Sequence, residues 1–317
     1  MSTRESLREW ASIYLKGIFM GAADTVPGVS GGTIALITGI YERLVSAIAA
    51  LDPAVLGVVF QLHRADGRAA LKRAFFEMDL PFLIVLAAGV FSAVIGLSRL
   101  LAISLEQFPG PMNAFFFGLI AASAIVLYGD VSLESPRRII AAIGGIAVAF
   151  AVTGVTAGGT VPHFLPLIFV SGAVTSSAML LPGISGAALL YVLGQYEFMI
   201  DSLHSFIDAL IGAVGGTGLD AVVESGLTVG VFLAGVAIGL LTIARVVKWA
   251  FEADRVTTVT VLVSLMVGAL RLPATEILDH TARWTPLSAL GIAVPLVGGA
   301  VLILGLDRLT DDLEYVD

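Results

Sequence analysis

The sequence predicts an all-α integral membrane protein built as an inverted-topology repeat, in which each half holds a re-entrant helical hairpin and three transmembrane helices. Two observations lead to this fold class: the composition of the chain and an internal duplication. Of the 317 residues, 57% are hydrophobic and only 13% are charged, and the mean hydropathy is +0.98. Soluble domains contain about 45–50% apolar and about 25% charged residues. The chain is therefore too apolar for a soluble protein and is expected to cross a membrane several times.

The composition also excludes several classes of function. The chain has no cysteine, which excludes disulfides and cysteine-ligated metals. Its histidines stand in polar connections, and no pair has the spacing of a helical metal site: His63, His163, His204 and His280. No metal or other cofactor is therefore expected. A net charge of −8 without a basic stripe argues against nucleic-acid binding.

Six segments are apolar enough to be transmembrane helices, which need about 20 mainly apolar residues. They are residues 80–102, 112–129, 138–157, 227–250, 256–271 and 287–306. Two further apolar regions, residues 10–50 and 164–200, are each interrupted by a Pro-Gly-x-Ser-Gly sequence. Because proline ends an incoming helix and glycine permits a reversal, each region is predicted to be a re-entrant hairpin. Residues 53–62 and 206–217 are expected to be either short surface helices or helix extensions.

The two interrupted regions are copies of one another. Seven residues of the first recur in the second at a single offset of 155 residues, without a gap: Pro27, Gly28, Ser30, Gly31, Gly39, Tyr41 and Glu42 match Pro182, Gly183, Ser185, Gly186, Gly194, Tyr196 and Glu197. A weaker echo follows, since Gly89 and Arg99 have the same separation as Gly235 and Arg245. The chain is therefore predicted to consist of a first repeat, residues 1–158, and a second repeat, residues 159–317.

The basic residues predict how the chain is oriented, because cytoplasmic loops carry an excess of Lys and Arg. With the N-terminus inside and each hairpin leaving on the side it entered, 14 of the 17 basic residues are cytoplasmic. Only Arg99, Arg271 and Arg283 are then outside. Each half contains an odd number of spans, so the halves are inverted relative to each other, as in secondary transporters. The protein is expected in the cytoplasmic membrane with both termini in the cytoplasm.

The Pro-Gly-x-Ser-Gly turns are the main candidates for a binding site. Irregular backbone at membrane depth must be buried in protein or line a wet cavity. Ser30 and Ser185 are placed to cap the outgoing helices, and a helix N-terminus attracts anions, phosphate in particular. The expected substrate-binding residues are Pro27, Gly28, Ser30, Gly31, Gly32, Thr33, Gly183, Ser185 and Gly186. The alternative is a pair of tightly packed turns whose serines satisfy only themselves.

Ionisable residues at membrane depth are costly and suggest function. Asp24, Glu42 and Glu197 are candidates for coupling transport to a proton or a sodium ion, with a helix cap or a solvated position as the alternative. Arg99, Arg245 and Arg271 are candidates for substrate binding, because the guanidinium fork suits phosphate and carboxylate. Snorkelling towards lipid headgroups is the alternative for the arginines.

An enzyme is not expected. The Gly-Val-Ser-Gly sequence at residues 28–31 resembles the nucleophile motif of rhomboid-type intramembrane proteases. That chemistry needs a base such as histidine beside the serine, and all four histidines stand in polar connections. A nucleophile also has no reason to occur in both halves. No catalytic residue is therefore assigned.

The residues around both turns resemble the polyprenyl-phosphate translocase family. Residues 24–33 with residues 39–43 are similar to its first signature, and residues 180–186 with residues 194–197 are similar to its second. Two further segments that resemble the family extend the similarity to about residues 10–306: Phe116-Phe117-Gly118-Leu119 and Val267-Gly268-Ala269-Leu270.

The resemblance implies that the chain returns a lipid carrier, undecaprenyl phosphate or its dolichyl counterpart, from the outer to the cytoplasmic leaflet. One departure is the second turn, where Ala187-Ala188 replaces Gly32-Thr33. If hydroxyls there bind the head group, the first hairpin is expected to bind better than the second. The alternatives are an ion-coupled carrier of a small soluble anion and a scaffold that transports nothing.

Overall fold

The structure, a computed structural model, describes residues 3–24, 30–52, 55, 65–154, 162–214, 220–281 and 283–314. Within these residues the regular structure is entirely helical. The first half contains α1 (Thr3–Asp24), α2 (Gly31–Ile37), α3 (Tyr41–Ala49), α5 (Ala65–Glu77), α6 (Leu80–Gln107), α7 (Pro109–Val126), the 3₁₀ helix η1 (Leu127–Asp130) and α8 (Pro136–Val152). The second half contains α9 (Leu165–Leu180), α10 (Gly186–Val192), α11 (Tyr196–Val214), α12 (Asp220–Ala253), α13 (Arg255–Ala269), α14 (Arg271–Asp279) and α15 (Pro286–Glu314).

Five stretches of the described helices are long and apolar enough to cross a membrane, and the number is six if the bent pair of α2 with α3 is counted as one span. The five are Leu80–Leu97, Pro109–Asp130, Ser225–Ala253, Arg255–Asp279 and Pro286–Gly305. They overlap five of the six predicted spans, and the all-helical membrane fold is confirmed. The remaining predicted span, residues 138–157, differs: α8 has 17 residues and ends at Val152, while residues 155–157 lie outside the described part.

The two interrupted regions have matching local structure. In each, a helix of seven residues follows a long helix in chain order, and the next helix begins at a tyrosine. Gly39 and Gly194 follow the short helices with positive φ values of 72° and 65°, the left-handed conformation that glycine adopts without strain. Ser30 and Ser185 are the N-caps of α2 and α10, as predicted.

The long helices pack in pairs, and two of the pairs cross the predicted boundary at residue 158. α1 lies along α6 and α9 along α12, whereas α7 pairs with α15 and α8 with α13. Every residue of α2 is buried, and fully buried side chains of α7 and α13, Ile120 and Met266, belong to the same core. The core is therefore shared by both halves and surrounds α2.

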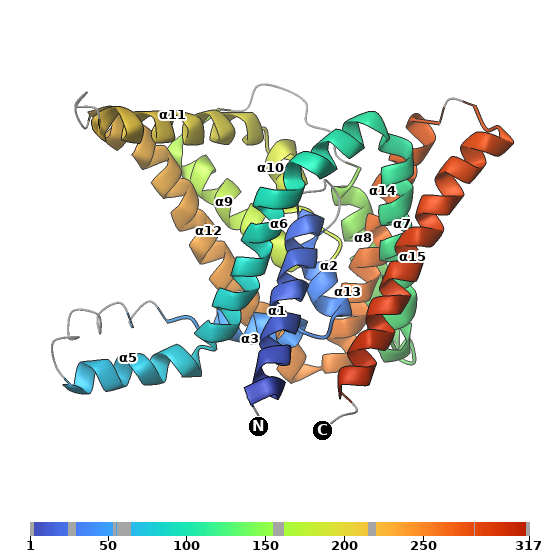
Figure 1. The fold of residues 1–317 in the computed structure, drawn as a ribbon, viewed down its shortest axis with the longest axis horizontal. Coiled ribbons are helices and arrows are strands. Elements are labelled where there is room, and N and C mark those ends of the chain that lie inside the picture. The colour runs from blue at the N-terminus through green and yellow to red at the C-terminus, as the bar shows by residue number, and fades with distance from the viewer. Residues whose placement is uncertain are drawn as a thin grey trace.

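Figure 1 shows the N- and C-terminal ends together at one end of the molecule, beside α3 and α5, with α11 lying across the opposite end. The predicted ambiguity over residues 206–217 is resolved as far as Val214, because residues 206–214 extend α11. Apart from Val55, residues 53–62 lie outside the described part.

Candidate functional site

The two Pro-Gly-x-Ser-Gly segments are in direct contact inside the protein. The Ser30 hydroxyl donates towards the carbonyl oxygens of Met179 and Leu181, at 3.3 and 3.2 Å. In return, the Gly183 N–H donates to the Thr33 hydroxyl at 3.0 Å. Ser30 and Thr33 are each only 1% exposed. The sequence predicted both segments as a site, and the structure brings them together as one buried polar junction.

The N-terminus of α2 is already satisfied by the chain itself. The Gly31 N–H donates to the Asp24 carboxylate at 2.7 Å, and the Gly32 N–H donates to the Ser30 hydroxyl at 3.2 Å. The Thr33 N–H donates to the Ser30 carbonyl at 2.9 Å. Asp24 therefore acts as a cap here, which was the alternative reading of this residue. Pro27 and Gly28, also predicted for the site, lie outside the described residues.

Lys16, which was not among the predicted site residues, completes this arrangement at the other end of α2. Its ammonium donates to the carbonyl of Thr38, the C-cap of α2, at 2.8 Å. A helix carries partial positive charge at its N-terminus and partial negative charge at its C-terminus. Asp24 and Lys16, both on α1, thus place a group of favourable charge at each end of α2.

The second interrupted region has neither charge at the corresponding positions, which are Ser171 and Met179. Ser185 caps α10 by accepting from the Ala188 N–H at 3.4 Å. Met179 stands where the first hairpin has Asp24, and a methyl group added at Gly186 would collide with the Met179 side chain. The N-terminus of α10 therefore has no carboxylate corresponding to Asp24.

Glu42, a predicted coupling residue, is paired with a basic residue distant in sequence. Its carboxylate lies 2.8 Å from Nε of Arg255, the first residue of α13. The neighbouring Arg43 pairs with Asp79 at 2.6 Å and with Glu9 at 3.6 Å. These ion pairs connect α3 to α13, α6 and α1.

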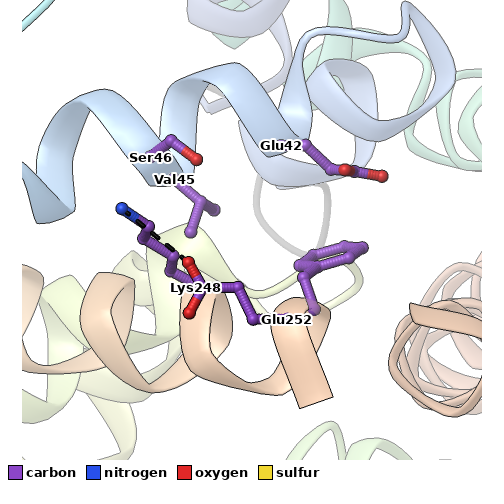
Figure 2. Close-up of a pocket in the computed structure, with 6 residues that line it drawn as sticks. Glu42, Val45, Ser46, Lys248 and Glu252 are labelled. Carbon is purple, nitrogen blue, oxygen red and sulfur yellow. Dashed lines mark ion pairs between the residues drawn. The ribbon is translucent and has the colours of Figure 1, made fainter. Parts of the chain in front are cut away.

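Beside this pairing, α3 and α12 enclose a small open cavity of about 170 Å³. Figure 2 shows Lys248 and Glu252 of α12, joined by an ion pair, facing Ser46 and Val45 of α3. Both signs of charge line the cavity, because Glu42 also borders it. This mixed lining does not resemble an anion site.

Arg245 and Arg271 contact different parts of the fold. Arg245 donates to the Leu51 carbonyl at 3.3 Å, just after α3. Arg271 donates to the Phe150 carbonyl at 2.7 Å, and its guanidinium lies 4.3 Å from the centroid of the Phe150 ring. Arg99 belongs to α6, but its side chain lies outside the described part. Glu197 is exposed at the start of α11.

These features define a polytopic α-helical membrane protein with two contacting helix-breaking segments in its interior, an architecture used by secondary transporters. The chain belongs to the undecaprenyl phosphate translocase-like family, whose model matches residues 20–285. This match confirms the family that was predicted from the motifs around the two turns.

Two relatives bear the name polyprenyl-phosphate transporter. One, from Vibrio cholerae, is 35% identical over 289 residues, which is 91% of this chain and 84% of the relative. The other, from Staphylococcus aureus, is 27% identical over 317 residues, 96% of this chain and 99% of the relative. Family and relatives are described as transporters and not as enzymes, in agreement with the prediction. No solved structure matches the chain.

Proposed function

We propose that the protein transports a polyprenyl phosphate across the cytoplasmic membrane, from the outer to the inner leaflet, so that the lipid carrier can be used again. Membership of the translocase-like family and the names of the relatives support this substrate. The observation that carries the proposal is the buried junction of the two turns, formed by the Ser30 and Gly183 hydrogen bonds. A phosphate bound there would lie between the two halves of the chain.

The proposed mechanism is alternating access by two inverted halves, residues 1–158 and 159–317, each with a re-entrant hairpin and both termini in the cytoplasm. Three observations support it. The two hairpins have matching caps and positive-φ glycines. The turn from α2 into α3 bends by 119°. The ends of the chain lie at the same end of the molecule (Figure 1).

In this mechanism, the head group binds at the loop residues Ser30, Gly31, Gly32, Thr33, Gly183, Ser185 and Gly186, together with Pro27 and Gly28. Arg99, Arg245 and Arg271 would offset its charge at different stages of the cycle. The isoprenoid tail stays in lipid. The Asp24 carboxylate and the phosphate would compete for the Gly31 N–H, so Asp24 is the first candidate for proton coupling, before Glu42 and Glu197.

The role of the loops is tested by leaflet exchange of a labelled polyprenyl phosphate in proteoliposomes. We expect the Ser30→Ala, Ser185→Ala double variant to lose exchange, because both caps at the junction are removed. Ser123→Ala is the matched control, since Ser123 is equally buried but donates only to the Leu119 carbonyl of its own helix. Full exchange by the double variant would contradict the proposed site.

The inverted topology is tested by labelling single cysteines with a reagent that does not cross the membrane. Ser46 on α3 and Asp201 on α11 are exposed and stand at the same position of the two repeats. The chain has no cysteine of its own to interfere. We expect Asp201→Cys to react from outside intact cells and Ser46→Cys only after lysis. Reaction of both from the same side would contradict the inversion.

Proton coupling through Asp24 is tested by the pH dependence of exchange. We expect Asp24→Asn to exchange lipid at a rate that no longer varies with pH, because the side chain cannot change its charge. Asn is close in shape to Asp and still accepts a hydrogen bond from the Gly31 N–H. A slower variant with the wild-type pH profile would exclude Asp24 as the coupling residue.

A further inference from the structure

Two hydroxyl groups in the second hairpin are buried without a hydrogen-bond partner. Ser171 is 0% exposed and Thr175 is 7% exposed, and neither side-chain oxygen has a partner. Other buried hydroxyls in the described helices, such as those of Ser123 and Ser264, donate to a carbonyl one turn earlier at 2.6 Å. Buried polar groups are nearly always paired, so these two call for a ligand or a water.

Both hydroxyls lie on the side of α9 that is turned away from α12. The stripe of α9 that contains Phe169 and Ala173 packs against Gly235 and Gly239 of α12. Ser171, Thr175 and Met179 follow one another at four-residue spacing and so form a different stripe. The last of these, Met179, borders Gly186 of α10. The unpaired hydroxyls therefore face the interior of the hairpin formed by α9 and α10.

In the first hairpin, a basic residue occupies the position that corresponds to Ser171. At the offset of 155 residues, Ser171 corresponds to Lys16, and Leu193, the C-cap of α10, corresponds to Thr38. The Lys16 ammonium donates to the Thr38 carbonyl at 2.8 Å. The first hairpin thus has a full positive charge at the negative end of its short helix. The second hairpin has the unpaired hydroxyl of Ser171 at the corresponding position, and the unpaired hydroxyl of Thr175, which corresponds to Met20, one turn further along α9.

We propose that the second hairpin binds a sodium ion between the Ser171 and Thr175 hydroxyls and the last carbonyls of α10, at the place that the Lys16 ammonium takes in the first hairpin. Hydroxyl and carbonyl oxygens are suitable ligands for a hard cation. The negative end of a short interior helix favours positive charge, and such helix ends coordinate sodium in other transporters. The proposal concerns the cation alone and goes beyond the proposed lipid substrate.

The site is tested with the purified full-length protein by thermal unfolding in sodium chloride and in choline chloride at constant ionic strength. We expect the Tm of the wild type to rise with sodium concentration, because a ligand that binds only the folded state stabilises it. Ser171→Ala and the shape-matched Thr175→Val should each weaken the apparent sodium affinity about tenfold, since each removes one oxygen ligand.

Two further variants test whether the sodium dependence of the Tm arises at this site. Ser171→Lys supplies the ammonium of the first hairpin and should give a Tm that no longer depends on sodium. Ser176→Ala is the control on the same helix and should keep the wild-type response, because the Ser176 hydroxyl already donates to the Ala173 carbonyl at 3.1 Å.

A wild-type Tm that is the same in sodium and choline would overturn the proposal and leave ordered water as the partner of the two hydroxyls. An unchanged sodium response in the Ser171→Ala, Thr175→Val double variant would overturn it equally. Both Tm measurements are made without lipid substrate, so their interpretation does not depend on whether the protein transports a polyprenyl phosphate.

Discussion

Gly183 and Gly39 illustrate two reasons why a turn can require glycine: a left-handed backbone conformation and close packing. Both have positive φ, 80° and 72°. A methyl group at Gly183 would lie 2.8 Å from the Leu265 carbonyl oxygen, whereas nothing lies within 4 Å of one at Gly39. Gly39 is therefore required only for its backbone conformation, and Gly183 also for the close packing of the second loop against α13.

We expect Gly39→Ala to lower the free energy of unfolding by about 1 kcal/mol, the usual cost of a left-handed conformation for alanine. Gly183→Ala should lower it by roughly 1–3 kcal/mol more, because the loop must also move away from α13. Denaturant unfolding of the two variants in detergent measures the difference. If both variants lose the same free energy of unfolding, moving the loop away from α13 costs no stability.

Asp254 provides a pH prediction outside the membrane spans. It is the N-cap of α13 and accepts from the Thr257 hydroxyl at 2.6 Å and from the Thr257 N–H at 3.0 Å. These hydrogen bonds, that of the hydroxyl first, hold the pKa of the Asp254 carboxyl below its ordinary value. The resulting stabilisation is complete above the unfolded pKa of about 4 and is lost as the pH falls through the lower folded pKa.

Asp254→Asn should accordingly lower the Tm at pH 7 and leave it less dependent on pH below about 4 than in the wild type. Thermal unfolding across this range in detergent makes the comparison. If the Tm falls equally in the two proteins as the pH is lowered below about 4, the charge of the Asp254 carboxylate does not contribute to stability.

Several single residues could be predicted from the sequence, and their partners could not. The caps formed by Ser30 and Ser185 follow from local sequence, because a cap reaches only two or three residues ahead. The pairing of Glu42 with Arg255 joins residues 213 positions apart and depends on how α3 and α13 approach. The sequence shows that Lys16 of the first repeat is replaced by Ser171 in the second. The sequence alone could not show that Lys16 contacts the C-cap of α2.

At the scale of elements, glycines set how closely the paired helices approach. On α1 and α6, methyl groups at Gly17 and Gly89 would collide with the facing backbone, and the same holds for Gly172 and Gly235 on α9 and α12. Within a membrane, small residues allow helices to gain packing energy that lipid cannot supply. The two pairs are therefore held by backbone contact along their length.

We expect Gly235→Val to separate α12 from α9, because its side chain would replace the contact with the Phe169 carbonyl. The variant should unfold at a lower temperature and lose lipid exchange. Gly230→Val, on the same helix, is the matched control, since nothing lies within 4 Å of a Cβ there. A similar Tm for both variants would show that the α9–α12 contact is not close-packed.

The helices themselves were largely predictable, and their pairing was not. Length and apolarity identified the spans, and the prolines and glycines identified the breaks. The predicted span at residues 138–157 extends beyond α8, which ends at Val152, and Gly154 just after it borders the Arg271 guanidinium. That α7 pairs with α15 and α8 with α13 is a property of the assembled core, because all these helices are similarly apolar.

At the scale of the whole molecule, polar contacts connect α3 and the residue just after its C-cap to α13 and α12. Arg255 pairs with Glu42, and Arg245 donates to the Leu51 carbonyl. α3 lies at the end of the molecule where the chain begins and ends (Figure 1). If the protein works by alternating access, these contacts must break when that end opens.

A reversible cross-link at this contact tests the requirement. The Glu42→Cys, Arg255→Cys double variant should be joined by a bifunctional thiol reagent that can be cleaved by reduction, and the cross-link should stop lipid exchange until it is reduced. The single variants, which cannot cross-link within one chain, are the controls for the reagent and for loss of the ion pair. Unimpaired exchange by the cross-linked protein would exclude movement of α3 away from α13.

The proposed movement of a polyprenyl phosphate between leaflets is tested most directly by exchange in proteoliposomes that contain only the wild-type protein. We expect protein-dependent exchange of a labelled polyprenyl phosphate and none of the matching polyprenol, because the proposed site recognises the phosphate head group. Exchange no faster than in empty liposomes, with folded protein and an imposed proton or sodium gradient, would contradict the claim. Uptake of a small soluble anion would then become the leading function.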